Sequence, residues 1–237
     1  MDDLEKVVKY YNDTKTIYSE YYVHKNTHKK EGLVKIYYGD GAIGNEINYK
    51  NGKEEGSFKS YYSNGNVNEE GTIKKEMLYG NHKLYHPNGK ICCEKEYDES
   101  GTFKINTLLD EKGRDCMLPE GDIIVYKAGG IYDESRSTPI NVYIKILVPS
   151  SARRVSTVKR DRIIKSRIEY GHVLEIVDEF GVSCRQARNI VHILTPTFYT
   201  VGEKIVPDGF DDNPEKDCAK GIHVHAHRDH CKYWFAH

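Results

Sequence analysis

Four histidines lie close together near the end of the sequence, in the stretch GIHVHAHRDH at residues 221–230. Side chains of a β-strand alternate between its two faces, so His223, His225 and His227 would point to the same side. Three imidazoles on one face are a known ligand set for zinc, with a fourth position open for water or substrate. One hypothesis is therefore a zinc site, and with it a metal-dependent enzyme.

The same histidines also fit a strand that binds no metal. They would then be surface or hydrogen-bonded residues of an edge strand, since the stretch lacks a CxxC pair. Residues that could complete a zinc site or assist its chemistry are Cys218, Asp229, Cys231 and His237. No other cofactor is expected, because the sequence has no GxxxxGK phosphate loop and no recognisable set of nucleophile, base and orienting residue.

A basic stretch at residues 153–167 raises the question of nucleic-acid binding. Ile163, Ile164 and Ile168 recur at helical spacing, which predicts a short amphipathic helix with a basic face. Such a face could contact phosphates, but a solvated helix explains the same pattern. The net charge is only −1, so the whole chain exerts no general attraction on nucleic acid or on an anionic membrane.

Composition narrows the class of protein. The chain has 237 residues, of which 38% are hydrophobic and 30% charged, a globular balance. Its 20 glycines and 19 tyrosines favour β-structure with many turns. The acidic start lacks an apolar signal segment, no run approaches the ~20 apolar residues of a membrane span, and the cysteines are scattered. We expect a soluble, cytoplasmic protein with free thiols.

The β-structure of the first half is organised in repeats of 24 residues. Glycines recur at this interval, as Gly32, Gly56 and Gly80. The pairs Asp40-Gly41, Asn64-Gly65 and Asn88-Gly89 lie between alternating segments and predict two-residue type I′ hairpin turns. Asn51-Gly52 predicts the same turn between the first two hairpins. Lys75-Glu76 lacks the signal, so a different turn is expected there.

The hairpin register assigns the repeat side chains to two faces. One face pairs Lys35 with Glu46, Lys59 with Glu70 and Lys83 with Glu94, beside Tyr37 and Tyr61. The opposite face is apolar and aromatic, and it supplies the candidate partner-binding residues Tyr38, Tyr49, Phe58 and Tyr62. That face needs a cover, either from the second half of the chain or from a partner, because a large exposed apolar patch marks an interaction site.

This pattern resembles the MORN repeat in its shortened variant form, in which EG-x-aromatic-x-x-YY-x-NG recurs. The resemblance covers residues 10–101. It implies an antiparallel β-hairpin meander that serves as a scaffold or protein-binding surface, in some members a lipid-associated one. It carries no catalytic residue.

A second domain follows, and we place the boundary so that the domains are 1–107 and 108–237. Short β-rich runs from residue 122 onwards, the helix at 153–167 and a final helix with Cys231, Trp234 and Phe235 on one stripe predict a small α+β domain. The expected fold class is therefore mainly β: an antiparallel hairpin meander followed by a small α+β domain.

The stretch YTVGEKIVPDGFDDNPEKDCAKGIHVH is similar to a domain of unknown function that large DNA viruses place after pentapeptide or MORN-type repeats. The matching residues include Cys218, Gly221, Ile222 and His223. The resemblance implies a viral setting, with the protein in the host-cell cytoplasm or the virion, and no particular reaction.

These observations favour a non-enzymatic interaction or scaffold protein that binds a protein partner through its repeat sheet. The alternatives are the metal-dependent enzyme that would use the histidine cluster and the nucleic-acid binder that would use the basic helix. A membrane surface is a further, less favoured partner for repeats of this kind.

Overall fold

A computed structural model of the chain describes residues 3–12, 15–133, 135–158, 164–190, 196–216 and 219–235. The chain divides into two units, Met1–Asp115 and Cys116–His237, which we call the repeat unit and the C-terminal unit. The boundary falls later than residue 107 because the segment after the last repeat strand is tied back to the repeats. The Leu109 N–H donates to the Cys92 carbonyl at 2.8 Å, and His86 Nε2 donates to the Leu109 carbonyl at 2.8 Å.

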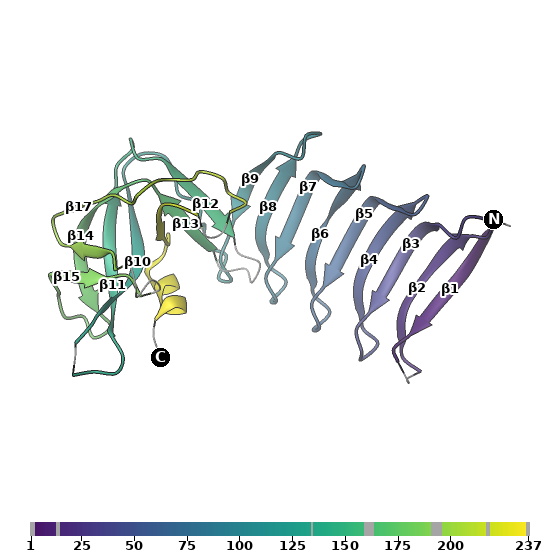
Figure 1. The fold of residues 1–237 in the computed structure, drawn as a ribbon, viewed down its shortest axis with the longest axis horizontal. Coiled ribbons are helices and arrows are strands. Elements are labelled where there is room, and N and C mark those ends of the chain that lie inside the picture. Colours follow the sequence, from purple (N-terminus) through teal and green to yellow (C-terminus); the bar gives the residue numbers. More distant parts are fainter. Residues whose placement is uncertain are drawn as a thin grey trace. The chain divides into compact units, whose positions relative to one another are not determined.

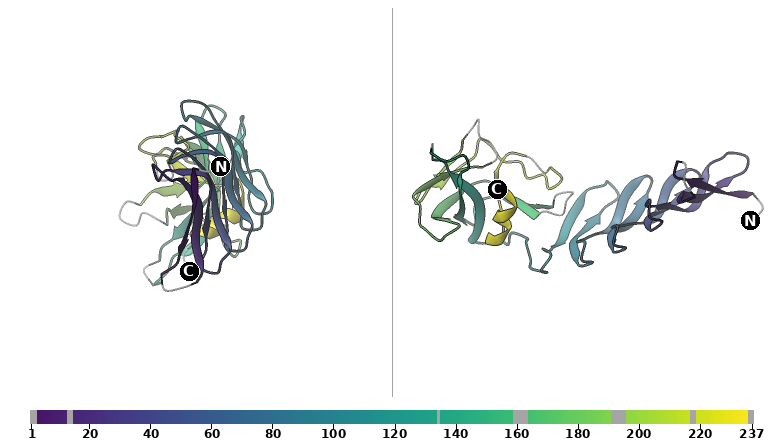
Figure 2. Two further views of the ribbon diagram at one scale, coloured as in Figure 1. Left: turned by 90° about the vertical axis from the view of Figure 1, so that its right-hand side faces the viewer. Right: turned by 90° about the horizontal axis from the view of Figure 1, so that it is seen from below.

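The repeat unit is one antiparallel sheet in which the order of the strands follows the chain (Figure 1). Every connection is a hairpin, and the described residues of this unit form a single layer (Figure 2). Its strands are β1 (Leu4–Tyr10), β2 (Ile17–His24), β3 (Lys30–Tyr37), β4 (Ile43–Lys50), β5 (Lys53–Tyr61), β6 (Val67–Lys74), β7 (Met77–Tyr85), β8 (Ile91–Tyr97) and β9 (Phe103–Leu108).

The turns within the hairpins differ from the prediction of two-residue type I′ turns. The Tyr38 N–H donates to the Ala42 carbonyl, so the loop is longer, and only Gly41 has a positive φ, of 89°. Asp40 serves as a side-chain acceptor instead, since its Oδ1 takes the Ala42 N–H at 3.0 Å. Asn64 and Asn88 do the same in the next two hairpins. The predicted pairing still holds, because a bulge after Ile36 restores the register.

The turns between the hairpins are the true two-residue turns. Asn51 and Gly52 have φ of 50° and 85°, which is the left-handed pair that a type I′ turn requires. Lys75 and Glu76 have φ of 54° and 65°, so the expectation of a different turn there is wrong. Position in the repeat, rather than residue preference, determines this turn. The left-handed conformation of two side-chain-bearing residues makes it a strained site.

The C-terminal unit contains a six-stranded sheet, ordered β16-β15-β10-β11-β14-β17, and a three-stranded sheet, ordered β12-β13-β18. A bridge joins them, because Tyr126 and His225 exchange main-chain hydrogen bonds of 2.8 and 2.7 Å. Its elements are β10 (Ile123–Ile131), β11 (Ile140–Val148), β12 (Arg154–Val158), β13 (Ile164–Ile168), β14 (Gly171–Asp178), β15 (Gln186–Arg188), β16 (Phe198–Thr200), β17 (Lys204–Ile205), β18 (Ile222–Val224) and the 3₁₀ helix η1 (Arg228–Trp234).

An apolar core draws buried side chains from both sheets of the C-terminal unit, among them Val125, Ile144, Ile168 and Val224. A second cluster forms where Cys231 of η1 packs against β10 and β11, with Trp234 and Phe235 at its margin. The predicted apolar stripe at the C-terminal end therefore does pack on the sheet. The helix that carries it is 3₁₀ rather than α.

The helix predicted over 153–167 is wrong. β12 and β13 pair as antiparallel strands there, with Val155 opposite Arg167. The sequence of β13, IKSRI, alternates with period two, which is the strand signal that outweighs the helical spacing of its isoleucines. Residues 159–163 between the two strands lie outside the described residues.

Among the described residues, strands account for 55% of the structure and helix for 3%, which confirms a mainly β fold. The second domain is correspondingly poorer in helix than the α+β expectation. No helix in the described parts of the chain has the length and apolar content needed to cross a membrane.

Candidate binding sheet and histidine cluster

One face of the repeat sheet carries a continuous line of opposite charges, which we call the charge row. Lys59 and Glu70 lie opposite each other with Nζ 2.9 Å from the carboxylate, as the sequence predicts, and the equivalent pairs in the hairpins before and after are 3.7 and 3.3 Å apart. The same register continues between hairpins, so the row crosses β2 to β8 without a break. Its members are Glu20, Lys35, Glu46, Lys59, Glu70, Lys83 and Glu94.

Tyrosine hydroxyls complete the partners of the charge-row carboxylates. The Tyr85 hydroxyl donates to Glu70 at 2.7 Å, and together with Lys59 it lowers the pKa of that carboxyl. Burial, followed by the bond to Glu70, raises the pKa of Tyr85 to about 12. Equivalent bonds join Tyr61 to Glu46 and Tyr37 to Glu20. These charged groups therefore find their partners inside the sheet.

Two of the four predicted partner-binding residues make contacts between repeats. The Tyr38 hydroxyl donates to the carbonyl of Tyr61, and the Tyr62 hydroxyl donates to the carbonyl of Tyr85 at 2.6 Å. Each bond therefore links one hairpin to the next, 23 residues further along the chain. Both side chains are half-buried. Binding of a partner by these tyrosines stays a prediction, but the structure gives them a role within the repeat.

The other two candidates, Phe58 and Tyr49, are also half-buried. Phe58 lies opposite Gly71, and a Cβ added at Gly71 would be 2.9 Å from the Phe58 ring. At the equivalent positions of the preceding hairpin, Val34 lies opposite Ile47. Two side chains of medium size there thus fill the space that a large one, Phe58, and a glycine fill in this hairpin. Tyr49 donates to Glu54 at 2.9 Å and lies under the Lys30 ammonium. The aromatic face thus covers itself in part.

Exposed apolar side chains lie on the charge-row face instead, which sequence analysis missed. Tyr22 is opposite Lys6, whose Nζ reaches Glu20. Leu33 lies two residues before Lys35, in a stretch of β3 that pairs in regular register with β4. Tyr79 is opposite Thr72, two residues after Glu70. The exposed fractions are Tyr22 45%, Leu33 40%, Met77 46% and Tyr79 36%. Their alternation with the lysines and glutamates is the signal that would have placed them on this face.

The structure separates the three histidines that the sequence places on one strand face. His223 lies on β18 opposite Arg167, His225 is buried, and His227 directly precedes η1 as its N-cap. Burial lowers the pKa of His225 to about 3, so its ring is neutral, and Nδ1 donates to the Ile164 carbonyl at 3.0 Å. Among the described residues, these three side chains do not bring their ligand atoms within 4.8 Å of one another.

Rings rather than ligand atoms define this cluster. His230 of η1 lies 5.3 Å from the ring of His227 and 6.1 Å from that of His225, which also stacks on Trp234. Burial raises the pKa of the adjacent Cys231 thiol to about 12, which disfavours a nucleophilic thiolate. Zinc binding by the three histidines stays a prediction, and Cys218 and His237 lie outside the described residues.

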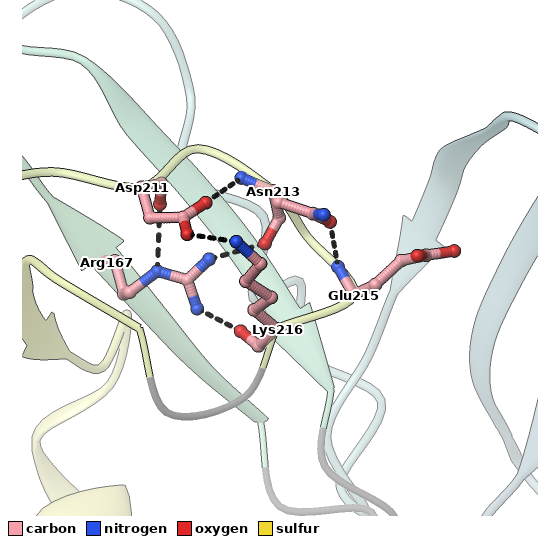
Figure 3. A network of polar contacts seen from close by, with 5 residues as sticks. All are labelled: Arg167, Asp211, Asn213, Glu215 and Lys216. Carbon is pink, nitrogen blue, oxygen red and sulfur yellow. Dashed lines mark hydrogen bonds and ion pairs between the residues drawn. The ribbon is translucent and has the colours of Figure 1, made fainter.

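A buried arginine that sequence analysis assigned to a basic helix anchors the loop before β18 (Figure 3). Arg167 is fully buried, and its guanidinium donates to the carbonyls of Asp211 at 3.1 Å, Asn213 at 2.6 Å and Lys216. The loop is closed further by the Lys216 ammonium, 2.7 Å from the Asp211 carboxylate. Arg167 thus supports the segment that leads into the Gly221-Ile222-His223 motif.

The motif residues serve this packing. Gly221 has φ of 135°, and a Cβ there would lie 3.3 Å from the Arg167 Cβ, so a larger residue would crowd the arginine. Ile222 is buried in the core, and His223 pairs with Arg167 across the strands. The other described cations of the basic stretch also have partners, since Arg153 pairs with Glu169 at 2.9 Å and Arg154 donates to main-chain carbonyls. A continuous basic face is therefore not seen among the described residues.

The fold and the periodic contacts define a β-hairpin repeat protein with a compact β domain after the repeats. Comparison with protein families agrees: residues 30–51, 54–75 and 78–99 each match the MORN repeat variant. Residues 114–231 match a family of unknown function (DUF5758). No curated protein matches the chain. The chain thus contains three MORN-variant repeats and a DUF5758 domain, which confirms both resemblances. β1 and β2 precede the matched repeats and extend the same sheet.

Proposed function

We propose that this chain is a non-enzymatic scaffold protein that binds a protein partner through the charge-row face of its repeat sheet. The observation that carries the proposal is the set of exposed residues Tyr22, Leu33, Met77 and Tyr79 on that face. Tyrosine and methionine are enriched in protein interfaces, and tyrosine is among the residues that most often carry the binding energy. MORN repeats, which generally mediate interactions with proteins or membranes, give coarse support.

The charge row suits this face to burial under a partner. Removing an unpaired charge from water is costly, whereas charges with partners already in place cost less to cover. Glu70, for example, already has Lys59 and the Tyr85 hydroxyl as partners. The exposed apolar side chains can therefore supply the favourable burial while the row beneath them stays satisfied.

The setting of this interaction is a separate part of the proposal. The resemblance to domains of large DNA viruses supports a viral protein that acts in the cytoplasm of the host cell or is carried in the virion. Extracts of infected cells, with the virions purified from them, are accordingly the source in which to seek the partner.

Site-specific photo-crosslinking tests which face binds. A photoreactive phenylalanine would replace Tyr22 or Tyr79 on the charge-row face, Phe58 or Tyr62 as the originally predicted sites, and Phe180 of the C-terminal unit as a control that is 82% exposed. We expect the same partner to crosslink at positions 22 and 79 and not at 180. Crosslinks confined to positions 58 and 62 would assign binding to the opposite face instead.

A matched set of variants then measures the contribution to binding. Tyr22→Ser and Tyr79→Ser should each weaken the partner identified by crosslinking by about fivefold or more, since interface anchors contribute over ~1 kcal/mol. Phe180→Ser is the control for loss of an exposed ring. Equal affinity of all three variants for that partner would contradict the proposal.

A further inference from the structure

The outer edge of the repeat sheet is formed by β1, which among the described residues pairs with β2 alone. Two main-chain hydrogen bonds fix the direction of its polar groups. The Asp3 carbonyl accepts the Lys25 N–H at 2.9 Å, and the Tyr11 N–H donates to the Thr16 carbonyl at 3.0 Å. Because these groups alternate along an antiparallel strand, odd-numbered residues bond to β2 and even-numbered ones point outward. The outward set is Leu4, Lys6, Val8 and Tyr10.

An edge of this kind is a template for another strand unless something blocks it. Proteins commonly protect such edges with proline, bulges or charged side chains, lysine above all. The sequence of β1, LEKVVKY, has no proline or glycine, and its pairing with β2 is regular as far as Lys9. Its charges are of both signs. Tyr10 at the end of the strand is 57% exposed.

The charges of β1 are complementary to those of a second β1 that runs in the opposite direction. Placing Val7 opposite Val7 of the second copy puts Glu5 opposite Lys9 and Lys9 opposite Glu5. The same register puts Leu4 opposite Tyr10 and Lys6 opposite Val8, which are the residues whose main-chain groups point outward. Every outward N–H and C=O of the strand then faces a partner group.

We propose that two copies of this chain associate through β1 in this antiparallel register, with a twofold axis at Val7. The two charge pairs occupy non-hydrogen-bonded positions, where facing side chains approach most closely. They also lie on the face opposite the charge row, because Lys6 points to that row, with its Nζ 2.9 Å from Glu20. The contact leaves the charge row unobstructed and joins two repeat sheets into one.

Neighbouring registers are less favourable for the same residues. A shift of two residues in one direction places Lys6 opposite Lys6, which brings two like charges together. The opposite shift places Lys9 opposite Val7 and removes both charge pairs. Shifts by a single residue would oppose inward-pointing main-chain groups to outward ones. Antiparallel pairing about Val7 is therefore the register that the sequence of β1 selects.

Light scattering during size exclusion, applied to the full chain over a range of concentrations, gives the first test. We expect a dimer that dissociates on dilution. Val8→Pro should weaken the dimer by about tenfold or more, because it removes an outward N–H that the second copy needs while the bonds to β2 remain. A monomeric wild-type chain at every concentration would overturn the proposal, as would a dimer that Val8→Pro leaves unchanged.

A charge exchange tests the register itself. Glu5→Lys places lysine opposite Lys9, and Lys9→Glu places glutamate opposite Glu5, so each variant alone should be monomeric. Mixed in equal amounts, the two variants should form a heterodimer. Lysines at positions 5 and 9 of one chain then face glutamates at positions 9 and 5 of the other. The double variant E5K/K9E should form homodimers again. Dimers that persist in both single variants, or a mixture that stays monomeric, would contradict pairing about Val7.

Discussion

The two units of this chain reach stability by different means. The repeat unit is a single layer in which the same polar contacts recur from hairpin to hairpin, such as the Tyr62 hydroxyl on the Tyr85 carbonyl. The C-terminal unit encloses an apolar core, and the fully buried Arg167 ties the loop of residues 206–216 to a strand. Repeats that contact only their neighbours lose stability locally, whereas a shared core is lost as a whole. Mutations in the two units should therefore differ in how far the structural opening spreads, as well as in how much free energy of unfolding they cost.

The largest expected effect is in the C-terminal unit, from Arg167→Met. It leaves the carbonyls of Asp211, Asn213 and Lys216 without their donor, and we expect a loss of about 3 kcal/mol or more in the free energy of unfolding. Denaturant unfolding followed by the fluorescence of Trp234, the one tryptophan, measures it. Arg153→Met removes an exposed ion pair and is the control, with an expected change under ~1 kcal/mol. Equal effects of both would refute a special role for Arg167.

A smaller and local effect is expected from Gly71→Ile. The new side chain overlaps the Phe58 ring, and overpacking of this kind costs about 1–3 kcal/mol. Adding Phe58→Val recreates the Val34 and Ile47 pair of the preceding hairpin, so the double variant should recover much of the loss. Hydrogen exchange should show faster opening of β5 to β7 in the single variant alone. Opening that spreads through the C-terminal unit would break the comparison between the two units.

The turn at Lys75-Glu76 should allow a gain in stability. Asn-Gly, the pair found at residues 51 and 52, adopts the left-handed conformation with less strain than Lys-Glu. Replacing Lys75-Glu76 with Asn-Gly should therefore stabilise the repeat unit by about 1 kcal/mol. The change also removes the exposed pair between Lys53 and Glu76, so Lys53→Ala serves as the control for that loss. Thermal melting followed by circular dichroism decides between gain and loss. A lower melting temperature than that of Lys53→Ala would show the present turn to be unstrained.

The smallest effect concerns single tyrosine hydroxyls of the charge row. Tyr61→Phe should cost about 1 kcal/mol, the usual net value of one hydrogen bond. Burial raises the pKa of Tyr61 from 10.0 to about 12, so the folded state favours the neutral ring. Its contribution is fully present below pH 10 and disappears as the pH rises towards 12.

Melting temperatures across that range test this dependence. A variant with Tyr37, Tyr61 and Tyr85 all changed to Phe should lose less stability between pH 10 and 12 than the wild type. Tyr10→Phe is the matched control, because Tyr10 is exposed. A triple variant with the same alkaline loss as the wild type would show that these hydroxyls do not set the pH response.

The sequence predicted the repeat unit better than the C-terminal unit, for physical reasons. Exact spacing located the hairpins, and the pairing of Lys59 with Glu70 followed from period-two alternation. The turn types did not follow, because Asp40 acts through its side chain while Lys75 is forced into a left-handed conformation by its position. The first choice depends on the side chain of a turn residue and the second on place in the repeat, and neither follows from the preference of a residue pair for a type I′ turn.

In the C-terminal unit, the local sequence pattern gave the wrong secondary structure where tertiary contacts determine it. The isoleucines near residue 164 fit a helix, yet Arg167 is needed on a strand where three distant carbonyls converge. The histidine spacing fits a strand, but β18 ends at Val224, before His225, and η1 begins at Arg228, directly after His227. The exposed residues of the charge-row face were missed because they do not recur from repeat to repeat: the position of Leu33 is Ser57 in the next repeat, and the position of Tyr79 is Glu55 in the one before.

The unbroken register of the charge row has a consequence for how such chains can change in length. Each hairpin presents the same glutamate to the lysine of the next, so duplication or deletion of 24 residues would leave every junction intact. Each added copy would lengthen the surface by two strands, or about 9–10 Å. The length of the binding surface can therefore change in evolution by whole repeats, without a change in the contacts between them.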